Sequence, residues 1–375
     1  MHPVSGLSED CILVLGLGDL GQRIINALSN RPVGRLIAAA RDREVAEAVA
    51  GQARLIAGLC DGPRRIEASH IDLADTDQTA AELDRLSPDV IVLTASRVTW
   101  WQLPAHVARV PYGAWVPLQV TLVRQLMQAR ATAGITAPVV ALPYPDAVGP
   151  VLAGVGLAPQ LGAGNVLEIA AKLTALAAQQ HNTPREHVQV QLVAHHATQR
   201  IAFSAFRTLA GTEPRTPAPF IARISIDGRP LAPETVHAYF NAPYPLPPGR
   251  AVHALTAAAT VATIDALRSR TPRLLHVPAP GGRPGGYPVT VSRTGVKLNL
   301  PNGVTEADAI AVNAVAARWD GIEQIAANGT ISFTPAASHE IERALGLRLE
   351  QITVEQHPAI ADQLAARLRH RPPAA

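Results

Sequence analysis

Lysine, cysteine and aromatic residues are scarce in this chain of 375 residues. Its only lysines are Lys172 and Lys297, so arginine supplies nearly all of the positive charge. The two cysteines are too few for a disulfide framework or a cysteine-based metal site, and we expect no metal. The arginines are scattered and aromatic residues make up 4% of the chain, which argues against nucleic-acid binding.

Long hydrophobic runs are also missing. No apolar stretch reaches the roughly 18–20 residues that span a bilayer, and the first six residues contain no signal-peptide apolar core. We therefore expect a cytoplasmic protein without a membrane partner. The chain is nevertheless 47% hydrophobic and 17% charged, with a net charge of +3, as in a globular protein that buries a large core.

The most informative stretch is the run DCILVLGLGDLGQ at residues 10–22. An apolar segment leads directly into G-x-G-x-x-G, and an amphipathic segment follows, which predicts strand, tight turn and helix. Gly16 permits the turn, Gly18 lets the backbone approach a pyrophosphate, and Gly21 lets the helix pack closely on the strand. With Asp19 and Leu20 they form a predicted dinucleotide site at a helix N-terminus. The alternative is a glycine-rich turn that binds nothing.

The second apolar run, residues 35–40, indicates which dinucleotide is bound. Many NAD-binding proteins carry an acidic residue about 20 residues after the first glycine, where this chain has Ala40 and Arg41. Arg41 and Arg43 are suited to a 2′-phosphate, because guanidinium groups bind phosphate oxygens in pairs. We predict NADP as the cofactor, with NAD possible. In the alternative reading both arginines are solvated and Asp42 binds the ribose of NAD.

Apolar runs and helical patterns alternate over the first 164 residues. Expected strands are 12–15, 36–39, 65–69, 90–93 and 139–142; expected helices are 22–29, 43–59, 79–86 and 116–133. This alternation predicts an α/β fold with a doubly wound parallel Rossmann sheet at residues 9–164. An α+β substrate domain is expected at 165–370, with a tail at 371–375. Its predicted strands include 188–193, 201–206 and 221–226, and its last helices are 306–328, with a break, and 337–345.

The order of these parts resembles the lactate/malate dehydrogenase family. The resemblance is carried by VIVLTAS at 90–96, PYPD at 143–146, LGAGNVLE at 161–168 and the segment 182–196, which ends in AHH where the family has Gly-Glu-His-Gly. It implies a small-molecule substrate, hydride transfer with a nicotinamide cofactor, and assembly as a homodimer or homotetramer. Thr94, Ala95 and Ser96 take the place of the turn that borders the nicotinamide.

The resemblance also implies an acid–base pair. His195 takes the place of the family's catalytic histidine, and Glu168 takes that of its aspartate partner. An imidazole titrates near neutral pH and can donate the proton that a reduced carbonyl oxygen needs, while a carboxylate on its other nitrogen fixes the tautomer. His196 is the alternative and would face the opposite side of an extended segment. His195 could equally be a structural histidine, with Glu168 at a helix start.

Departures from the family concern the substrate. Ala171 stands where the family has the arginine that binds the substrate carboxylate. Arg109, in the long segment 96–118, is a candidate for polarising the carbonyl, and Arg250 is a candidate replacement cation. Trp100 and Trp101 could contact a bulky substrate or could simply pack this segment onto the protein.

Two classes of function follow. The first is an NAD(P)-dependent oxidoreductase that reduces a carbonyl or imine compound other than simple pyruvate or oxaloacetate. The second is a non-catalytic nucleotide-binding homologue that acts as a sensor or partner subunit. An opine-type imine reductase is a further alternative. The retained Glu168 and His195 favour an enzyme, whereas Ala171 favours a changed substrate or lost catalysis.

Overall fold

A six-stranded parallel sheet organises the N-terminal part of the protein, with strand order β3-β2-β1-β4-β5-β6. The computed structural model describes residues 10–60, 62–63, 65–99, 101, 103–203 and 219–369. The order reverses between β1 and β4, as in doubly wound dinucleotide-binding sheets, where ligands bind beyond the carboxyl ends of the strands. The α/β fold class predicted from the alternating pattern is confirmed.

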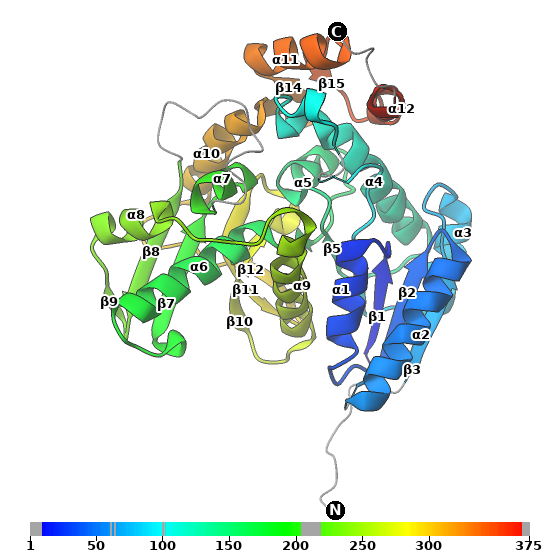
Figure 1. Ribbon diagram of the computed structural model, residues 1–375, viewed down its shortest axis with the longest axis horizontal. Coiled ribbons are helices and arrows are strands. Elements are labelled where there is room, and N and C mark those ends of the chain that lie inside the picture. The colour runs from blue at the N-terminus through cyan, green and yellow to red at the C-terminus, as the bar shows by residue number, and fades with distance from the viewer. Residues whose placement is uncertain are drawn as a thin grey trace, which may run out of the picture.

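Helices cover both faces of this sheet (Figure 1). Its strands are β1 (Cys11–Leu15), β2 (Arg35–Ala40), β3 (Arg65–His70), β4 (Val90–Leu93), β5 (Val139–Ala141) and β6 (Leu161–Gly162). The connecting helices are α1 (Asp19–Leu28), α2 (Arg43–Leu59), α3 (Thr76–Leu86), α4 (Val116–Thr132) and α5 (Pro145–Ala153). Every residue of β1 and β4 is buried, because helices pack on both sides of the central strands.

The glycine turn is built by close backbone contacts. The Gly16 N–H donates to the Ala39 carbonyl at 2.9 Å, so the end of β2 lies against the turn. Gly16 has φ +93°, and a Cβ there would lie 2.6 Å from the Ala95 nitrogen. A Cβ on Gly21 would lie 1.9 Å from the Gly16 carbonyl oxygen. Only glycines fit these two positions, as the sequence predicts.

Antiparallel sheets form the following part of the chain. They have the orders β7-β8-β9 and β10-β11-β12, and a single bridge between Ala194 and Gly286 joins them. The strands are β7 (Val188–Val193), β8 (Ile221–Ile226), β9 (Arg229–Pro230), β10 (Arg273–Pro278), β11 (Gly286–Ser292) and β12 (Gly295–Leu298). The helices are α6 (Asn165–Gln180), α7 (Gln199–Ala202), α8 (Pro233–Asn241) and α9 (His253–Arg268). Helix α9 packs on α1 and joins this part to the parallel sheet.

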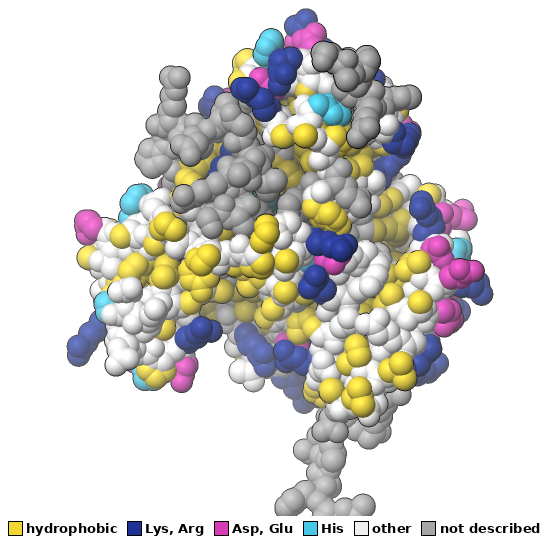
Figure 2. All heavy atoms as spheres, in the orientation of Figure 1, with side chains coloured by type: hydrophobic (Ala, Val, Ile, Leu, Met, Phe, Trp, Pro, Cys, Tyr) yellow, Lys and Arg dark blue, Asp and Glu magenta, His cyan; other side chains and the backbone are white. Residues whose placement is uncertain are grey.

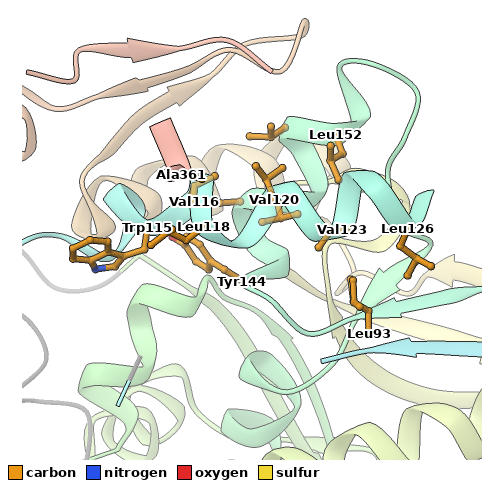
Figure 3. Packing of buried hydrophobic residues seen from close by; sticks show 14 of the residues in the cluster. Leu93, Trp115, Val116, Leu118, Val120, Val123, Leu126, Tyr144, Leu152 and Ala361 are labelled. Atoms are coloured by element: carbon orange, nitrogen blue, oxygen red, sulfur yellow. The ribbon is translucent and has the colours of Figure 1, made fainter. Parts of the chain in front are cut away.

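The last segment of the chain returns to the parallel sheet. It comprises α10 (Glu306–Ala317), β13 (Ile322–Ile325), β14 (Ile331–Phe333), α11 (Pro335–Leu345), β15 (Gln351–Ile352) and α12 (His357–Arg369). Helix α12 packs on α4, and one buried cluster contains residues of both. Figure 3 shows Val116, Val120 and Val123 of α4 between Leu93 of β4 and Ala361 of α12. This contact brings the C-terminal segment over the edge of the sheet that carries the glycine turn.

Two predicted elements are corrected. The helix expected over 306–328 ends at Ala317; a short 3₁₀ helix, η9 (Arg318–Asp320), follows, and then strand β13 begins. Gly321 adopts φ +83° and closes the helical segment. The strand expected at 201–206 is wrong at its start, because Ile201 and Ala202 lie in α7, while residues 204–206 lie outside the described residues. The expected boundary at residue 164 stays a prediction.

The surface carries charges of both signs. Figure 2 shows Lys and Arg side chains in several small groups on the face in view, interspersed with Asp and Glu. Within the described ranges, no helix combines the length and the apolarity that crossing a membrane requires.

We predict that Gly21→Ala destabilises the fold by about 1–3 kcal/mol, because the new Cβ overlaps the Gly16 carbonyl. Gly18→Ala is the matched control: no atom lies within 4 Å of its added Cβ, and Gly18 has φ −69°. Urea unfolding of both variants checks this. Equal stability of the two variants would contradict the described turn.

Candidate active site

A cavity of about 510 Å³ opens beyond the carboxyl ends of β1 and β4. Its wall combines the glycine turn with side chains from segments far along the chain. The acidic and basic residues on this wall are Asp19, Glu168, His196, Arg200, His253 and Asp320. Such convergence of polar groups in an otherwise apolar cavity is typical of a ligand site.

His196 and Asp320 form the central pair of the cavity. His196 begins a 3₁₀ helix, η5 (His196–Thr198), just after β7, and Asp320 ends η9. The His196 Nδ1 atom lies 2.8 Å from the Asp320 Oδ2 atom. The His196 side chain is 23% exposed and lines the cavity, and its Nε2 atom bonds to no described residue. Nε2 is therefore available to a ligand.

Three further side chains hold this pair in place. Tyr144 donates its hydroxyl to Asp320 Oδ2 at 2.7 Å, and the Arg200 Nη2 donates to Asp320 Oδ1 at 3.0 Å. The ring of Tyr112, in the 3₁₀ helix η3 (Tyr112–Trp115), stacks on the His196 imidazole with centroids 4.6 Å apart. Both oxygens of the buried Asp320 are thus bonded, and the imidazole is fixed on one face and at one nitrogen.

The electrostatics of the pair favour the charged form of both members. Burial alone would raise the pKa of Asp320, but the charges of His196 and Arg200 and the hydrogen bond from His196 lower it overall. Burial alone would lower the pKa of His196, but Asp320 and the nearby Asp146 raise it above its ordinary value. A carboxylate on Nδ1 thus stabilises the imidazolium and favours Nε2 as the proton-donating atom.

Glu168 occupies a different part of the cavity wall. It lies in the first turn of α6, is 3% exposed, and accepts hydrogen bonds from Gln199 at 2.8 Å and from Thr256 at 2.7 Å. Burial raises its pKa to about 7, although these two hydrogen bonds act in the opposite direction. The carboxyl group therefore titrates near neutral pH.

His195 lies next to the pair but outside the cavity wall. Its side chain is 1% exposed, and its Nδ1 atom accepts a hydrogen bond from the Ala197 N–H at 3.1 Å. That Nδ1 atom lies 3.8 Å from Asp320 Oδ2. Burial lowers the pKa of His195 despite its acidic neighbours, so the ring favours the neutral form.

The predicted pairing of His195 with Glu168 is corrected. Glu168 bonds to Gln199 and Thr256, and the carboxylate nearest to both histidines is Asp320. The physical reason is the alternation at the end of β7: successive side chains face opposite sides, so His196 reaches the cavity and His195 turns into the protein. The catalytic roles of these residues are taken up below.

Most of the residues predicted to bind a dinucleotide lie together on the cavity wall. They are Gly16, Gly18, Asp19, Leu20, Gly21, Thr94, Ala95 and Ser96. Gly18 precedes α1 and provides no side-chain cap, so the first N–H groups of this helix remain for a ligand. A Cβ on Gly18 would meet nothing within 4 Å. The turn therefore has the shape that a pyrophosphate requires.

Asp19 places a carboxylate at this same helix start. Its Oδ2 atom lies 2.8 Å from both the Arg23 Nε and the His253 Nδ1. The hydrogen bond from Arg23 outweighs burial and lowers the pKa of Asp19. The positive charge of Arg23 offsets the negative charge of Asp19, which would otherwise repel a bound phosphate.

Arg41 and Arg43 lie directly after β2, at the carboxyl edge of the sheet. Both are exposed, and neither lines the cavity. Asp42 between them caps α2, accepting from the Glu44 and Val45 N–H groups at 2.9 and 3.2 Å. The contact between Gly16 and Ala39 places this strand end beside the glycine turn, so the position suits the distal ribose of a dinucleotide.

The other predicted residues are dispersed. Arg109 is exposed and lies near Glu340 of α11, and Arg250 is exposed in a 3₁₀ helix, η7 (Gly249–Val252); neither lines the cavity. Trp101 does line it and makes an edge contact with His253 at 4.7 Å. Trp100 lies outside the described residues.

Asp320, Arg200, Tyr112 and Tyr144 are site residues that the sequence analysis missed. For Asp320 a signal existed, because Asp320-Gly321 is a turn dipeptide inside the expected helix over 306–328. For His196 the signal was the run Ala194-His195-His196-Ala197. Aligned with the family's Gly-Glu-His-Gly, this run has small residues at both ends and places His196 at the family's histidine. No local pattern distinguishes Arg200 from the other arginines.

Comparisons with solved structures find the same chain path. A lactate dehydrogenase from a Medee basin deep-sea metagenome library aligns with TM-score 0.55 and 14% identity, over 83% of this chain and 96% of its own. The malate dehydrogenase from Aeropyrum pernix gives 0.55 and 15%, over 82% and 97%. A minor L-lactate dehydrogenase from Enterococcus mundtii gives 0.56 and 14%, over 83% and 96%. The chain has the lactate/malate dehydrogenase fold.

This agreement confirms the predicted resemblance at the level of fold. No protein-family model matches the chain, and no curated protein matches its sequence. The three neighbours align over nearly their whole length but leave part of this chain uncovered. At these identities the activity has to be argued from the cavity itself.

From the raised pKa of Glu168 we predict how the free energy of unfolding changes with pH. In the folded state the pKa of Glu168 is about 7, whereas its ordinary value is 4.5. Proton binding by Glu168 therefore stabilises the folded state fully below pH 4.5, and this contribution is lost as the pH rises through 7. In Glu168→Gln the glutamine side chain does not titrate, so this contribution is absent. The unfolding free energy of this variant relative to wild type should therefore rise by about 3 kcal/mol between pH 4.5 and pH 8.

Urea unfolding at several pH values measures this difference. The exposed Glu186→Gln is the control and should give a flat difference. A flat difference for Glu168→Gln as well would show that Glu168 is not held in a desolvated state.

Proposed function

We propose that this protein is an NAD(P)-dependent oxidoreductase that reduces a carbonyl or imine compound. The observation that carries the proposal is the single cavity shared by the glycine turn and the His196–Asp320 pair. A dinucleotide on the turn and a proton donor on the opposite wall are the two components that such a reduction needs.

The cofactor would be held by residues of the parallel sheet. The N–H groups at the start of α1 suit the pyrophosphate, and the turn at Thr94, Ala95 and Ser96 suits the nicotinamide half. A nicotinamide cofactor supplies the hydride in this class of reaction. Arg41 and Arg43 support a preference for NADP, because a 2′-phosphate at the end of β2 would meet guanidinium groups.

His196 is the proposed general acid. Its Nε2 atom is open to the cavity, and Asp320 on Nδ1 favours the protonated ring. Transfer of the Nε2 proton to a carbonyl oxygen leaves a neutral imidazole that still donates Nδ1–H to Asp320. This arrangement replaces the originally expected His195 and Glu168 in the acid–base role.

The substrate is proposed to differ from simple pyruvate and oxaloacetate. Ala171, at the position of the family's carboxylate-binding arginine, is exposed and lies on the wall of a different cavity. A lost bidentate contact to a carboxylate is worth several kcal/mol. The expected homodimer or homotetramer and the cytoplasmic location stay predictions.

NADPH should bind about tenfold to a hundredfold more tightly than NADH, because one charge-assisted contact contributes about 1.5–3 kcal/mol. The double variant Arg41→Gln/Arg43→Gln should lose this preference and keep its NADH affinity. Gly18→Val is the control and should weaken the binding of both cofactors, since its side chain would enter the open space that the pyrophosphate is proposed to occupy. Calorimetric titration measures the affinities. Equal binding of both cofactors by the unaltered protein would exclude an NADP preference.

His196→Ala should lower turnover by roughly 10²–10⁴-fold without changing cofactor affinity. His195→Gln should have a much smaller effect, because its ring faces away from the cavity. The rate of reduction should fall as the pH rises through the elevated pKa of His196, since the protonated ring is the donor.

Screening carbonyl and imine compounds for NADPH oxidation provides the assay. Full activity of the His196 variant together with loss of activity in the His195 variant would assign the general acid to His195 instead. Full activity of both variants would refute histidine acid catalysis and favour the non-catalytic nucleotide-binding alternative.

A further inference from the structure

Glu168 differs from the other carboxylates on the cavity wall in its partners. Asp19 pairs with Arg23 and His253, and Asp320 pairs with His196 and Arg200. Glu168 is hydrogen-bonded only to the uncharged Gln199 and Thr256 and forms no ion pair with a described residue, although the charge of the nearby His196 lowers its pKa slightly against the larger effect of burial. It is thus a buried acid without a bound counter-charge.

A buried carboxylate with only neutral donors is energetically unfavourable. Ionised carboxylates that leave water lose several kcal/mol of solvation, and a cationic partner normally offsets the loss. In the proposed mechanism Glu168 has no role, because Asp320 supports His196. The fold nevertheless positions its carboxyl group on the cavity wall with two hydrogen bonds.

The carboxylate also keeps capacity for a further donor. Each oxygen accepts one hydrogen bond within the described protein, whereas a carboxylate oxygen can accept about two. Glu168, Thr256 and Gln199 all line the cavity, so a ligand nitrogen would reach the carboxyl group from that side. Gly164 keeps a side chain away from this carboxyl group, because a Cβ there would lie only 3.3 Å from Glu168 Oε1.

We propose that Glu168, with Thr256 and Gln199, forms a subsite for a cationic nitrogen group of the substrate. The proposal rests on the proposed function and narrows its substrate class to carbonyl or imine compounds that carry an ammonium or iminium group. An N⁺–H donor satisfies the open lone pairs and supplies the missing counter-charge in one contact. Glu168 is a specificity residue in this account, and His196 remains the general acid.

The other basic side chains on the cavity wall have partners of their own. His196 bonds to Asp320, and His253 bonds to Asp19. Ala171, three residues after Glu168, carries no charge and lies on the wall of a different cavity. Arg200 does not fill the subsite, because its guanidinium bonds to Ala197, Trp319 and Asp320.

The experiment compares two probes of equal shape, cyclohexylammonium and cyclohexanol, by ligand-observed NMR titration of the full-length protein at pH 8. Wild type should bind the ammonium at least tenfold more tightly than the alcohol. Glu168→Gln should lose this preference, and Glu168→Asp, which keeps the charge, should retain most of it. Glu186→Gln, on a surface outside the cavity, is the control and should behave as wild type.

The pH dependence identifies the group responsible. Ammonium binding should weaken as the pH falls from 8 to 6, because Glu168 takes up a proton near pH 7 while the probe stays charged. The charged groups that share the cavity are His196, Arg200, Asp320, Asp19 and His253. All of them remain in Glu168→Gln, so the part of the pH dependence that this variant loses belongs to Glu168.

The outcomes separate the subsite from the proposed function, since the titration needs no cofactor. Equal binding of both probes by wild type, or a preference that survives Glu168→Gln in the folded variant, would overturn the subsite. Retained ammonium preference in a protein that fails to bind NADPH or NADH would uphold the subsite and refute the oxidoreductase proposal.

Discussion

The buried carboxylate of Asp320 is the contact on which the active cavity depends. It accepts hydrogen bonds from His196, Arg200 and Tyr144, which come from two other segments of the chain. A buried charge is tolerated only when such partners surround it, and removal of one partner leaves the others uncompensated. The orientation of the His196 imidazole, the course of the segment after α10 and the start of α5 therefore depend on one another.

The elements that local patterns encode could be predicted, and those that tertiary contacts impose could not. The glycine turn, the first five strands of the parallel sheet and the helix that contains Glu168 follow from apolar periodicity and from the steric demands at Gly16 and Gly21. The β13-β14-β15 sheet and α12 were missed, because apolar residues recur in them with only a weak strand or helix period. Helix α12 gains stability by packing on α4, a contact that no local pattern reveals.

Single residues of the site also separate into those that a local pattern indicates and those that only tertiary contacts reveal. Spacing pointed to the segment at the end of β7, and this segment reaches the cavity, but which of His195 and His196 lines it depends on the side of the chain that faces the cavity. The partner carboxylate could not be found locally, since Asp320 lies 124 residues further on. Glu168 keeps the family's position but contacts Thr256 and Gln199, so an equivalent position on a shared fold does not carry an equivalent role.

The long separations around Asp320 bear on how the protein assembles. Tyr144 and Asp320 are 176 residues apart, and closing so long a loop comes late in folding because its entropy loss precedes any reward from the contact. The glycine turn is formed by residues close together near the start of the chain and can be in place while later segments are still being synthesised. The glycine turn would thus form before the segment that carries Asp320 is synthesised, and the cavity between them is completed only when the chain is nearly finished.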